Sequence, residues 1–135
     1  MSQENVEIVR RVYEAAARHD AAAVLALYDP EVEWDNSTGL GGTTGRGVYR
    51  GHEGLRHFFR EWREAWEYPE EVPEELFDAG EHVISVATVQ NRGRTSGAEV
   101  EWTQCGVWTI RQGKIIRVAW FRWRSDALEA AGLRE

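Results

Sequence analysis

The sequence is poor in cysteine, in long apolar runs and in pooled positive charge. Its one cysteine, Cys105, has no partner for an intrachain disulfide, and no secretory signal pattern opens the chain, so we expect a cytoplasmic protein. Charged residues interrupt every apolar run, so the runs are much shorter than the roughly 18 residues that a membrane-spanning helix needs. We therefore expect a soluble chain with no membrane partner. The net charge of −7 opposes the phosphate backbone and argues against nucleic-acid binding.

Metal-binding and nucleotide-binding patterns are missing as well. The four histidines, at positions 19, 52, 57 and 82, show no His-x-x-x-His spacing, and a single cysteine cannot form a Cys-x-x-Cys pair. The glycine-rich stretch completes neither the dinucleotide pattern nor a phosphate-binding loop. We therefore predict no metal and no cofactor.

Helices are predicted in the first half of the chain. Apolar residues recur at three- and four-residue spacing over residues 2–19, 21–28 and 52–66, which is typical of helices with one buried stripe. Between the second and third helices, five glycines in the twelve residues 36–47 exclude regular structure, and we interpret this loop as a lid. Ser125 is the expected N-cap of a short last helix.

Strands are predicted at residues 32–35, 74–78, 82–92, 98–111 and 114–123, and the last four follow one another as an antiparallel meander. Helices first and strands afterwards indicate an α+β domain. We expect a cone-shaped, strongly curved antiparallel sheet, with the three helices of the N-terminal half on its concave face and the short helix at its end. Residues 1–135 are long enough for one such domain, and a cavity between helices and sheet is the expected ligand site.

The two tryptophan-rich strands on either side of the Gln112–Gly113 turn are the most informative stretch. Strand side chains alternate between faces, so two rows should lie side by side and form a wall of the core or of a pocket. The first row is Trp102, Gln104, Gly106 and Trp108, and the second is Val118, Trp120 and Arg122.

This order of elements resembles the SnoaL-like branch of the nuclear transport factor 2-like superfamily. The similarity covers nearly the whole chain and is carried by three phrases: residues 48–54, residues 106–110 with 113–115, and residues 127–132. The resemblance implies a homodimer that pairs through the outer face of the sheet, where Val100, Ile110 and Phe121 would need cover. The superfamily includes ketosteroid isomerases, polyketide cyclases and proteins without catalysis, so function has to be argued at the site.

Ketosteroid isomerases of this superfamily use a carboxylate base on the first strand, a tyrosine on the first helix and a protonated acid on a later strand. Tyr13 occupies the matching helix position, either as a hydrogen-bond donor or as part of the buried stripe. Asp35 is the nearest match to the base, but an ungapped alignment puts Trp34 there, and one residue of slip reverses the face. The third position falls on Gly106, so that acid is absent.

Other candidates have both a functional and a structural interpretation. Gln104 with Arg122 would suit a carbonyl, phenolate or carboxylate, although Arg122 could instead stack on a neighbouring tryptophan at the rim. His52 could face the cavity as a proton shuttle or mark only the start of its helix. The residues expected to line the pocket are Trp34, Phe59, Trp62, Trp102, Gln104, Trp120 and Arg122.

The sequence therefore predicts a pocket protein for a small apolar or aromatic molecule. If it is an enzyme, we expect proton transfer of the isomerase, cyclase or lyase type on a carbonyl compound. Asp35 would be the base, Tyr13 and Gln104 the donors, and His52 or Arg122 would assist. The alternative is a non-catalytic ligand-binding or regulatory domain, which the missing acid at Gly106 favours. A protein-binding module is a third hypothesis.

Overall fold

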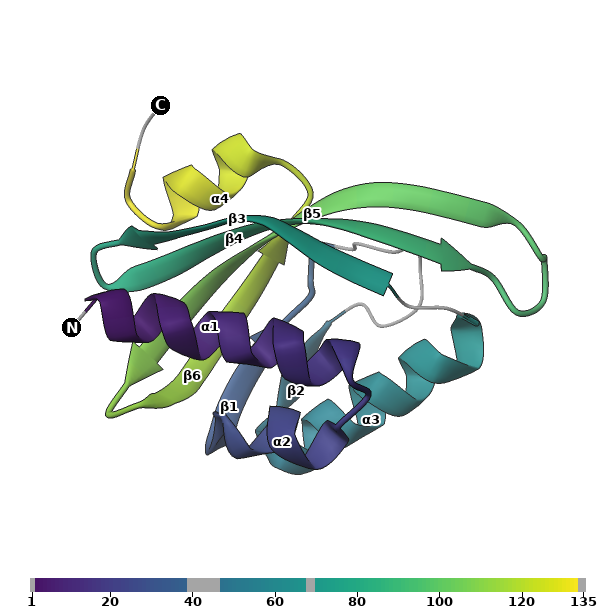
Figure 1. The fold of residues 1–135 in the computed structure, drawn as a ribbon, viewed down its shortest axis with the longest axis horizontal. Helices are drawn as coiled ribbons and strands as arrows, with labels where there is room; N and C mark the ends of the chain where they lie inside the picture. Colours follow the sequence, from purple (N-terminus) through teal and green to yellow (C-terminus); the bar gives the residue numbers. More distant parts are fainter. Residues whose placement is uncertain (1, 39–46, 68–69, 134–135) are drawn as a thin grey trace.

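A computed structural model describes residues 2–38, 47–67 and 70–133. The helices are α1 (Ser2–Ala17), α2 (Ala21–Ala26), α3 (Gly51–Ala65) and α4 (Arg124–Ala130). The strands are β1 (Tyr28–Asp35), β2 (Val48–Arg50), β3 (Glu70–Ala79), β4 (His82–Arg92), β5 (Glu99–Arg111) and β6 (Lys114–Phe121). They form one curved sheet in the order β2-β1-β6-β5-β4-β3, which confirms the predicted α+β cone (Figure 1). The middle of the expected lid, residues 39–46, lies outside the described residues.

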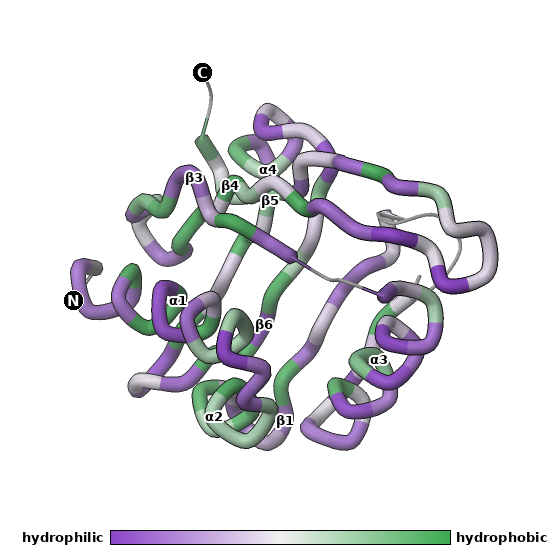
Figure 2. Tube along the Cα trace, turned by 45° about the vertical axis from the view of Figure 1, so that its right-hand side comes forward, coloured by the Kyte–Doolittle hydropathy of each residue, from purple (hydrophilic) through white to green (hydrophobic). Residues whose placement is uncertain are grey.

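Helices α1, α2 and α3 cover one face of the sheet, which we call the inner face, and α4 lies on the opposite, outer face (Figure 1). The Asp20 side chain accepts a hydrogen bond from the Ala23 amide and so caps α2. Figure 2 shows α2 as a uniformly hydrophobic helix, whereas hydrophilic residues dominate α3. Leu55 and Phe58 are the buried residues of α3, so Phe58 joins the stripe that the sequence predicted.

The predicted tryptophan wall is present on the inner face. Trp108 pairs with Val118 and Gly106 pairs with Trp120 across β5 and β6, and residues paired directly across an antiparallel ladder share a face. Both tryptophans are buried, with 1% and 4% exposure. The wall therefore forms the floor of the space under the helices.

Several predicted element boundaries were wrong. Ser125, the expected N-cap of the last helix, lies inside α4, whose N-cap is Trp123. Tyr28 opens β1 instead of closing α2, and Pro30 lies inside β1. The irregularity of the β1–β6 pairing between Tyr28 and Glu33 accommodates this proline, which has no amide hydrogen for a ladder. The short strand β2 was not predicted, and β3 begins at Glu70, four residues earlier than expected.

The outer face is partly covered by α4, whose Ala127 and Leu128 are buried there and pack against the partly buried Phe77 and Phe121. Ile110 was wrongly expected on this face. It lies in the inner cluster, because it shares the parity of Trp108 along β5. None of the helices in the described part of the chain is long and apolar enough to cross a membrane.

Candidate functional site

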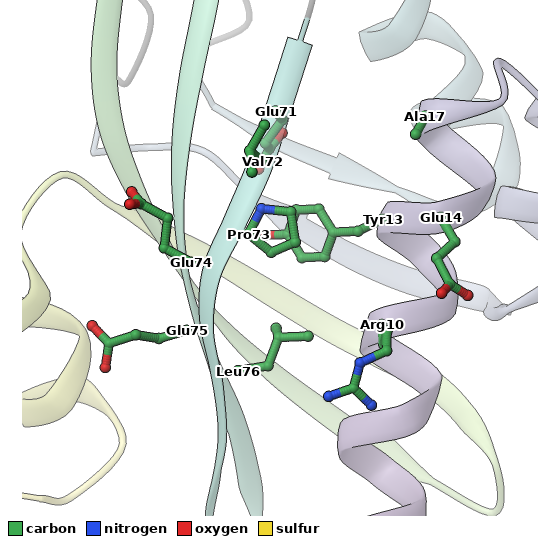
Figure 3. Close-up of a pocket in the computed structure, with 10 residues that line it drawn as sticks. All are labelled: Arg10, Tyr13, Glu14, Ala17, Glu71, Val72, Pro73, Glu74, Glu75 and Leu76. Carbon is green, nitrogen blue, oxygen red and sulfur yellow. The ribbon is translucent and has the colours of Figure 1, made fainter.

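A cavity of about 500 Å³ lies between α1 and β3 (Figure 3). This volume is in the range of small-molecule sites. The helix contributes Arg10, Tyr13, Glu14 and Ala17, and the strand contributes residues 71–76. The cavity therefore combines apolar side chains and Tyr13 with several charged groups, which are Arg10, Glu14, Glu71, Glu74 and Glu75.

A β-bulge in β3 brings one of these carboxylates, Glu71, to the inner face. Pro73 pairs with Ala87 and Glu75 pairs with Val86, so Glu74 is one residue too many for the ladder. The extra residue changes the face of every preceding side chain. Glu71 consequently lies beside Val89 on the inner side, whereas Glu74 accepts a hydrogen bond from Thr88 on the outer side.

Neutral donors hold the Glu71 carboxylate. The Gln104 Nε2 group donates to Glu71 Oε2 at 2.9 Å, and the Trp102 Nε1 group donates to Gln104 Oε1 at 3.1 Å. The tryptophan therefore fixes the orientation of the Gln104 amide so that its NH₂ group faces the acid.

Tyr13 reaches the same carboxylate from α1. Its side chain lines the cavity together with Glu71, and its hydroxyl lies 3.0 Å from the Ser85 Oγ atom, to which Trp108 Nε1 donates at 2.8 Å. Ser85 is fully buried, and Tyr13 and Trp108 are 7% and 1% exposed. A continuous polar chain thus crosses the apolar interior from β5 to the cavity.

Burial sets the protonation of the two reactive groups. It raises the pKa of Glu71 from about 4.5 to about 6, although the hydrogen bonds from Gln104 and Tyr13 act in the opposite direction. Burial, reinforced by the Glu71 charge, raises the pKa of Tyr13 well above its usual value. At pH 7 the site therefore presents a mostly ionised carboxylate beside a neutral phenol.

Gly106 makes room for this chain. A Cβ atom at this position would lie 2.6 Å from Trp108 Nε1, 2.8 Å from Ser85 Oγ and 3.0 Å from Trp120 Cζ3. The position of the isomerase acid is therefore filled by the Trp108 and Trp120 rings, and no side chain fits at residue 106 without displacing them.

The aromatic residues predicted to line the pocket gather on the inner side. Trp34 lies next to Trp120 and Phe59, with ring centroids 5.3 and 5.8 Å apart. Trp62 and Trp102 contact each other at 6.0 Å, nearer the end of α3. The structure thus brings all five close to the helix–sheet interior, although none of them lines the cavity between α1 and β3.

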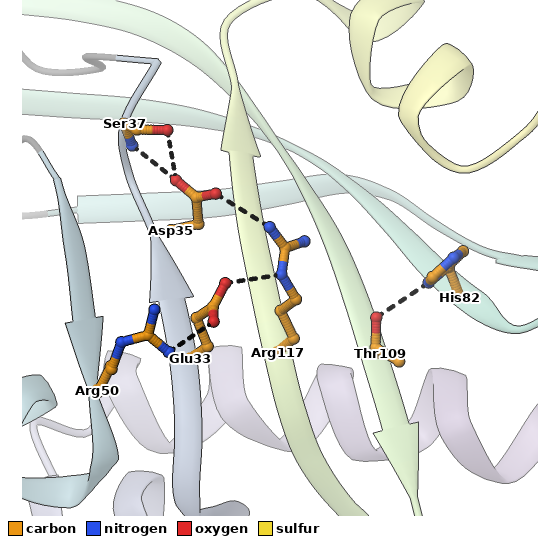
Figure 4. A network of polar contacts seen from close by, with 7 residues as sticks. All are labelled: Glu33, Asp35, Ser37, Arg50, His82, Thr109 and Arg117. Atoms are coloured by element: carbon orange, nitrogen blue, oxygen red, sulfur yellow. Dashed lines mark hydrogen bonds and ion pairs between the residues drawn. The ribbon is translucent and has the colours of Figure 1, made fainter.

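Asp35 lies on the other face of β1. It pairs with Ala119 in the sheet. Its carboxylate accepts hydrogen bonds from Arg117 Nη2 at 3.0 Å and from the Ser37 hydroxyl and amide at 2.6 and 2.9 Å (Figure 4). Partial burial alone would raise the pKa of Asp35, but the Ser37 bonds and the Arg117 charge outweigh it and lower the pKa. Trp34 occupies the inner position, so the geometry does not support Asp35 as the base.

The structure also separates His52 and Arg122 from the cavity. His52 Nε2 lies 2.9 Å from the carbonyl oxygen of Tyr28, so this nitrogen donates its hydrogen and ties α3 to β1. Arg122 is exposed, and its guanidinium lies 5.1 Å from the ring centre of Trp123, which is the rim stacking that the sequence left open.

Glu71 was missed by the sequence analysis because the predicted strand began only at Glu74. The available signal was the length of the neighbouring strand over residues 82–92, which needs a partner of similar length. The described residues contain no group of three His, Cys, Asp or Glu side chains that could hold a metal ion.

Solved structures share this fold. An NTF2-like protein of unknown function from Burkholderia pseudomallei K96243 is 24% identical, with 93% of this chain and 95% of that chain covered and a TM-score of 0.80. An NTF2-like protein from Burkholderia thailandensis E264 is 32% identical, with 86% and 88% covered and a TM-score of 0.79. TerC, co-crystallized with polyporic acid, is 22% identical, with 96% and 98% covered and a TM-score of 0.79.

The sequence itself gives the same assignment. It matches the SnoaL-like domain over residues 9–118, well over half of the chain. No curated protein is significantly similar to it. The fold with its helix–sheet cavity and the sequence match agree, and the chain belongs to the SnoaL-like domain family.

Proposed function

We propose that this protein binds a small, largely apolar or aromatic carbonyl compound in the cavity between α1 and β3, and that Glu71 transfers a proton to and from it. The observation that carries this proposal is the partly buried Glu71 side chain beside Tyr13 at that cavity. A carboxylate with a pKa of about 6 is suited to general acid–base catalysis near neutral pH.

The proposed step needs no cofactor. The substrate has a carbon–carbon double bond one position further from the carbonyl group, and the Glu71 carboxylate takes a proton from the carbon between them. The electron pair of that C–H bond forms a new C=C bond and the C=O π pair moves to the oxygen, which gives a conjugated dienolate. With substrate bound, the single Tyr13 hydroxyl proton turns from Glu71 to this oxygen and stabilises its charge. Glu71 then returns the proton to another carbon of the substrate, which gives an isomer and restores the carboxylate.

Similar proteins support the ligand-binding part of the proposal. Two proteins of the same fold are described as polyketide cyclases, and TerC was co-crystallized with polyporic acid. In this interpretation Glu71 takes the role that the sequence assigned to Asp35, and Tyr13 and Gln104 keep the roles of donors. We also propose a homodimer that pairs through the part of the outer face that α4 leaves uncovered.

A non-catalytic ligand-binding domain is the second candidate. It is favoured by Gly106, because the acid that completes the isomerase site is replaced there by tightly packed tryptophans. The two candidates differ in turnover and agree in binding.

A panel of an enone, an epoxide and a hydroxyquinone tests both candidates. Binding is followed by tryptophan fluorescence and turnover by mass spectrometry. For a carbonyl substrate that is turned over, Glu71→Gln should abolish turnover and Tyr13→Phe should slow it roughly 100-fold. Glu70→Gln removes an outward-facing carboxylate from the same strand and should change neither binding nor turnover. Binding without turnover supports the second candidate, and turnover that survives in Glu71→Gln refutes the proposed base.

A further inference from the structure

We propose that Ser85, held in place by Trp108, is a positioning residue that orients the hydroxyl proton of Tyr13 toward Glu71. This inference rests on the proposed function only for its catalytic meaning, because the orientation itself is a property of the hydrogen-bond chain. Ser85 lies in β4 and reaches neither the cavity nor a ligand within it.

The orientation follows from counting donors and acceptors. Trp108 Nε1 can only donate, and it donates to Ser85 Oγ at 2.8 Å. The Ser85 hydroxyl still carries its own proton, and the hydrogen bonds of the described residues give it no partner except Trp108 and the Tyr13 oxygen, 3.0 Å away. Because Ser85 is fully buried, a proton without an acceptor would be costly.

One arrangement gives every hydrogen an acceptor. Trp108 donates to Ser85, Ser85 donates to Tyr13, and Tyr13 donates to the Glu71 carboxylate. If Tyr13 donated to Ser85 instead, the Ser85 proton would have no acceptor and Glu71 would lose one of its two donors. The bond from Gln104 confirms that Glu71 is an acceptor, because the Gln104 oxygen is already used by Trp102.

The geometry around Gly106 shows that this chain depends on close packing. Any side chain at residue 106 would approach both Trp108 Nε1 and Ser85 Oγ to less than 3 Å. Gly106, at the position of the isomerase acid, therefore leaves room for Trp108 and Ser85. These two side chains then orient the Tyr13 hydroxyl. The tyrosine then points its proton at the reacting end of the cavity.

Titration of the Glu71 carboxyl group, followed by ¹³C NMR in the free protein, tests the orientation. Tyr13→Phe removes a charge-assisted hydrogen bond and should raise the titration midpoint by roughly one pH unit. Ser85→Ala removes the group that polarises Tyr13 and should raise it by only about 0.2 pH units. Trp108→Phe should change the midpoint in the same direction as Ser85→Ala.

The sign of the Ser85→Ala effect separates the two orientations. If Tyr13 donates to Ser85, the variant frees the phenol for Glu71 and the midpoint falls, which overturns the proposal. An unchanged midpoint in Tyr13→Phe overturns it as well. Thr88→Ala removes a hydroxyl from the outer face of the same strand, and a shift there as large as in Ser85→Ala would also overturn it. If the midpoints shift in the expected directions but no panel compound is turned over, the orientation is supported and the proposed catalysis is refuted.

Discussion

Replacing Glu71 with glutamine should make the protein more stable at neutral pH. Burial raises the pKa of this carboxyl group from about 4.5 to about 6, so the folded state holds the proton more tightly than the unfolded state. Ionisation therefore costs stability as the pH rises through this window. Glutamine keeps the shape of the side chain and carries no charge to bury.

The magnitude follows from the shift of about 1.5 pH units and a value of about 1.4 kcal/mol per unit. Relative to wild type, the Glu71→Gln variant should gain about 2 kcal/mol between pH 4 and pH 7.5, with about 1.2 kcal/mol of it present by pH 5.5. With a urea dependence of about 2 kcal/mol per M, the full effect moves the unfolding midpoint by about 1 M.

Urea unfolding at pH 4, 5.5 and 7.5, followed by tryptophan fluorescence, measures this difference. Glu70→Gln is the matched control, because it removes an exposed carboxylate from the same strand, and its effect should be the same at all three pH values. A Glu71→Gln variant whose stability relative to wild type stays constant or falls with rising pH would show that the carboxylate is not buried as described.

Three further predictions concern other parts of the molecule. Gly106→Ala should lower the free energy of unfolding by about 1–3 kcal/mol, because its Cβ atom would overlap Trp108 and Ser85; urea unfolding checks this, and an unchanged midpoint contradicts it. Asp35→Asn should leave ligand binding unchanged and lower stability at pH 7. That stability difference should disappear as the pH falls through the lowered pKa of Asp35, and persistence in acid would contradict the ion pair. Burial raises the pKa of the Cys105 thiol to about 11, so a thiol reagent at pH 8 should label it only after unfolding, and rapid labelling of the folded protein would contradict its burial.

The fold could be predicted from the sequence because its signals are periodic. The stripes of the helices and the alternation of Trp102, Gln104 and Trp108 depend on local spacing, and local spacing survives in the structure. The short strand β2 gave no such signal, since Val48, Tyr49 and Arg50 are too few to show a period. It forms because its backbone pairs with the free edge of β1.

The candidate site was harder to predict because it depends on a single bulge. Counted back from the turn at Gly80 without an extra residue, Glu71 would pair with Gln90 and face outward. The bulge at Glu74 makes it pair with Val89 and face inward. Nothing in the sequence marks this insertion, because Pro73 and its acidic neighbours are compatible with either register.

The same problem affected β1. The choice between Trp34 and Asp35 required the register of a strand that pairs in parallel with β6, some 85 residues later in the chain. A parallel pair has no hairpin turn from which to count. The sequence therefore identified the two alternatives correctly and contained no information that could decide between them.

The position of β1 has a consequence for how the protein folds. Strands β3 to β6 are joined by short turns and can pair with one another as each is completed, whereas β1 must wait for β6, the last strand of the chain. Contacts between residues so distant in sequence form slowly, because a long loop has to close first. Helix α1, which carries Tyr13, packs on β3 and β4, so Tyr13 and Glu71 meet when this helix docks on the meander. A nascent chain would expose its tryptophan wall until that docking step, so the interval before docking is when aggregation is most expected.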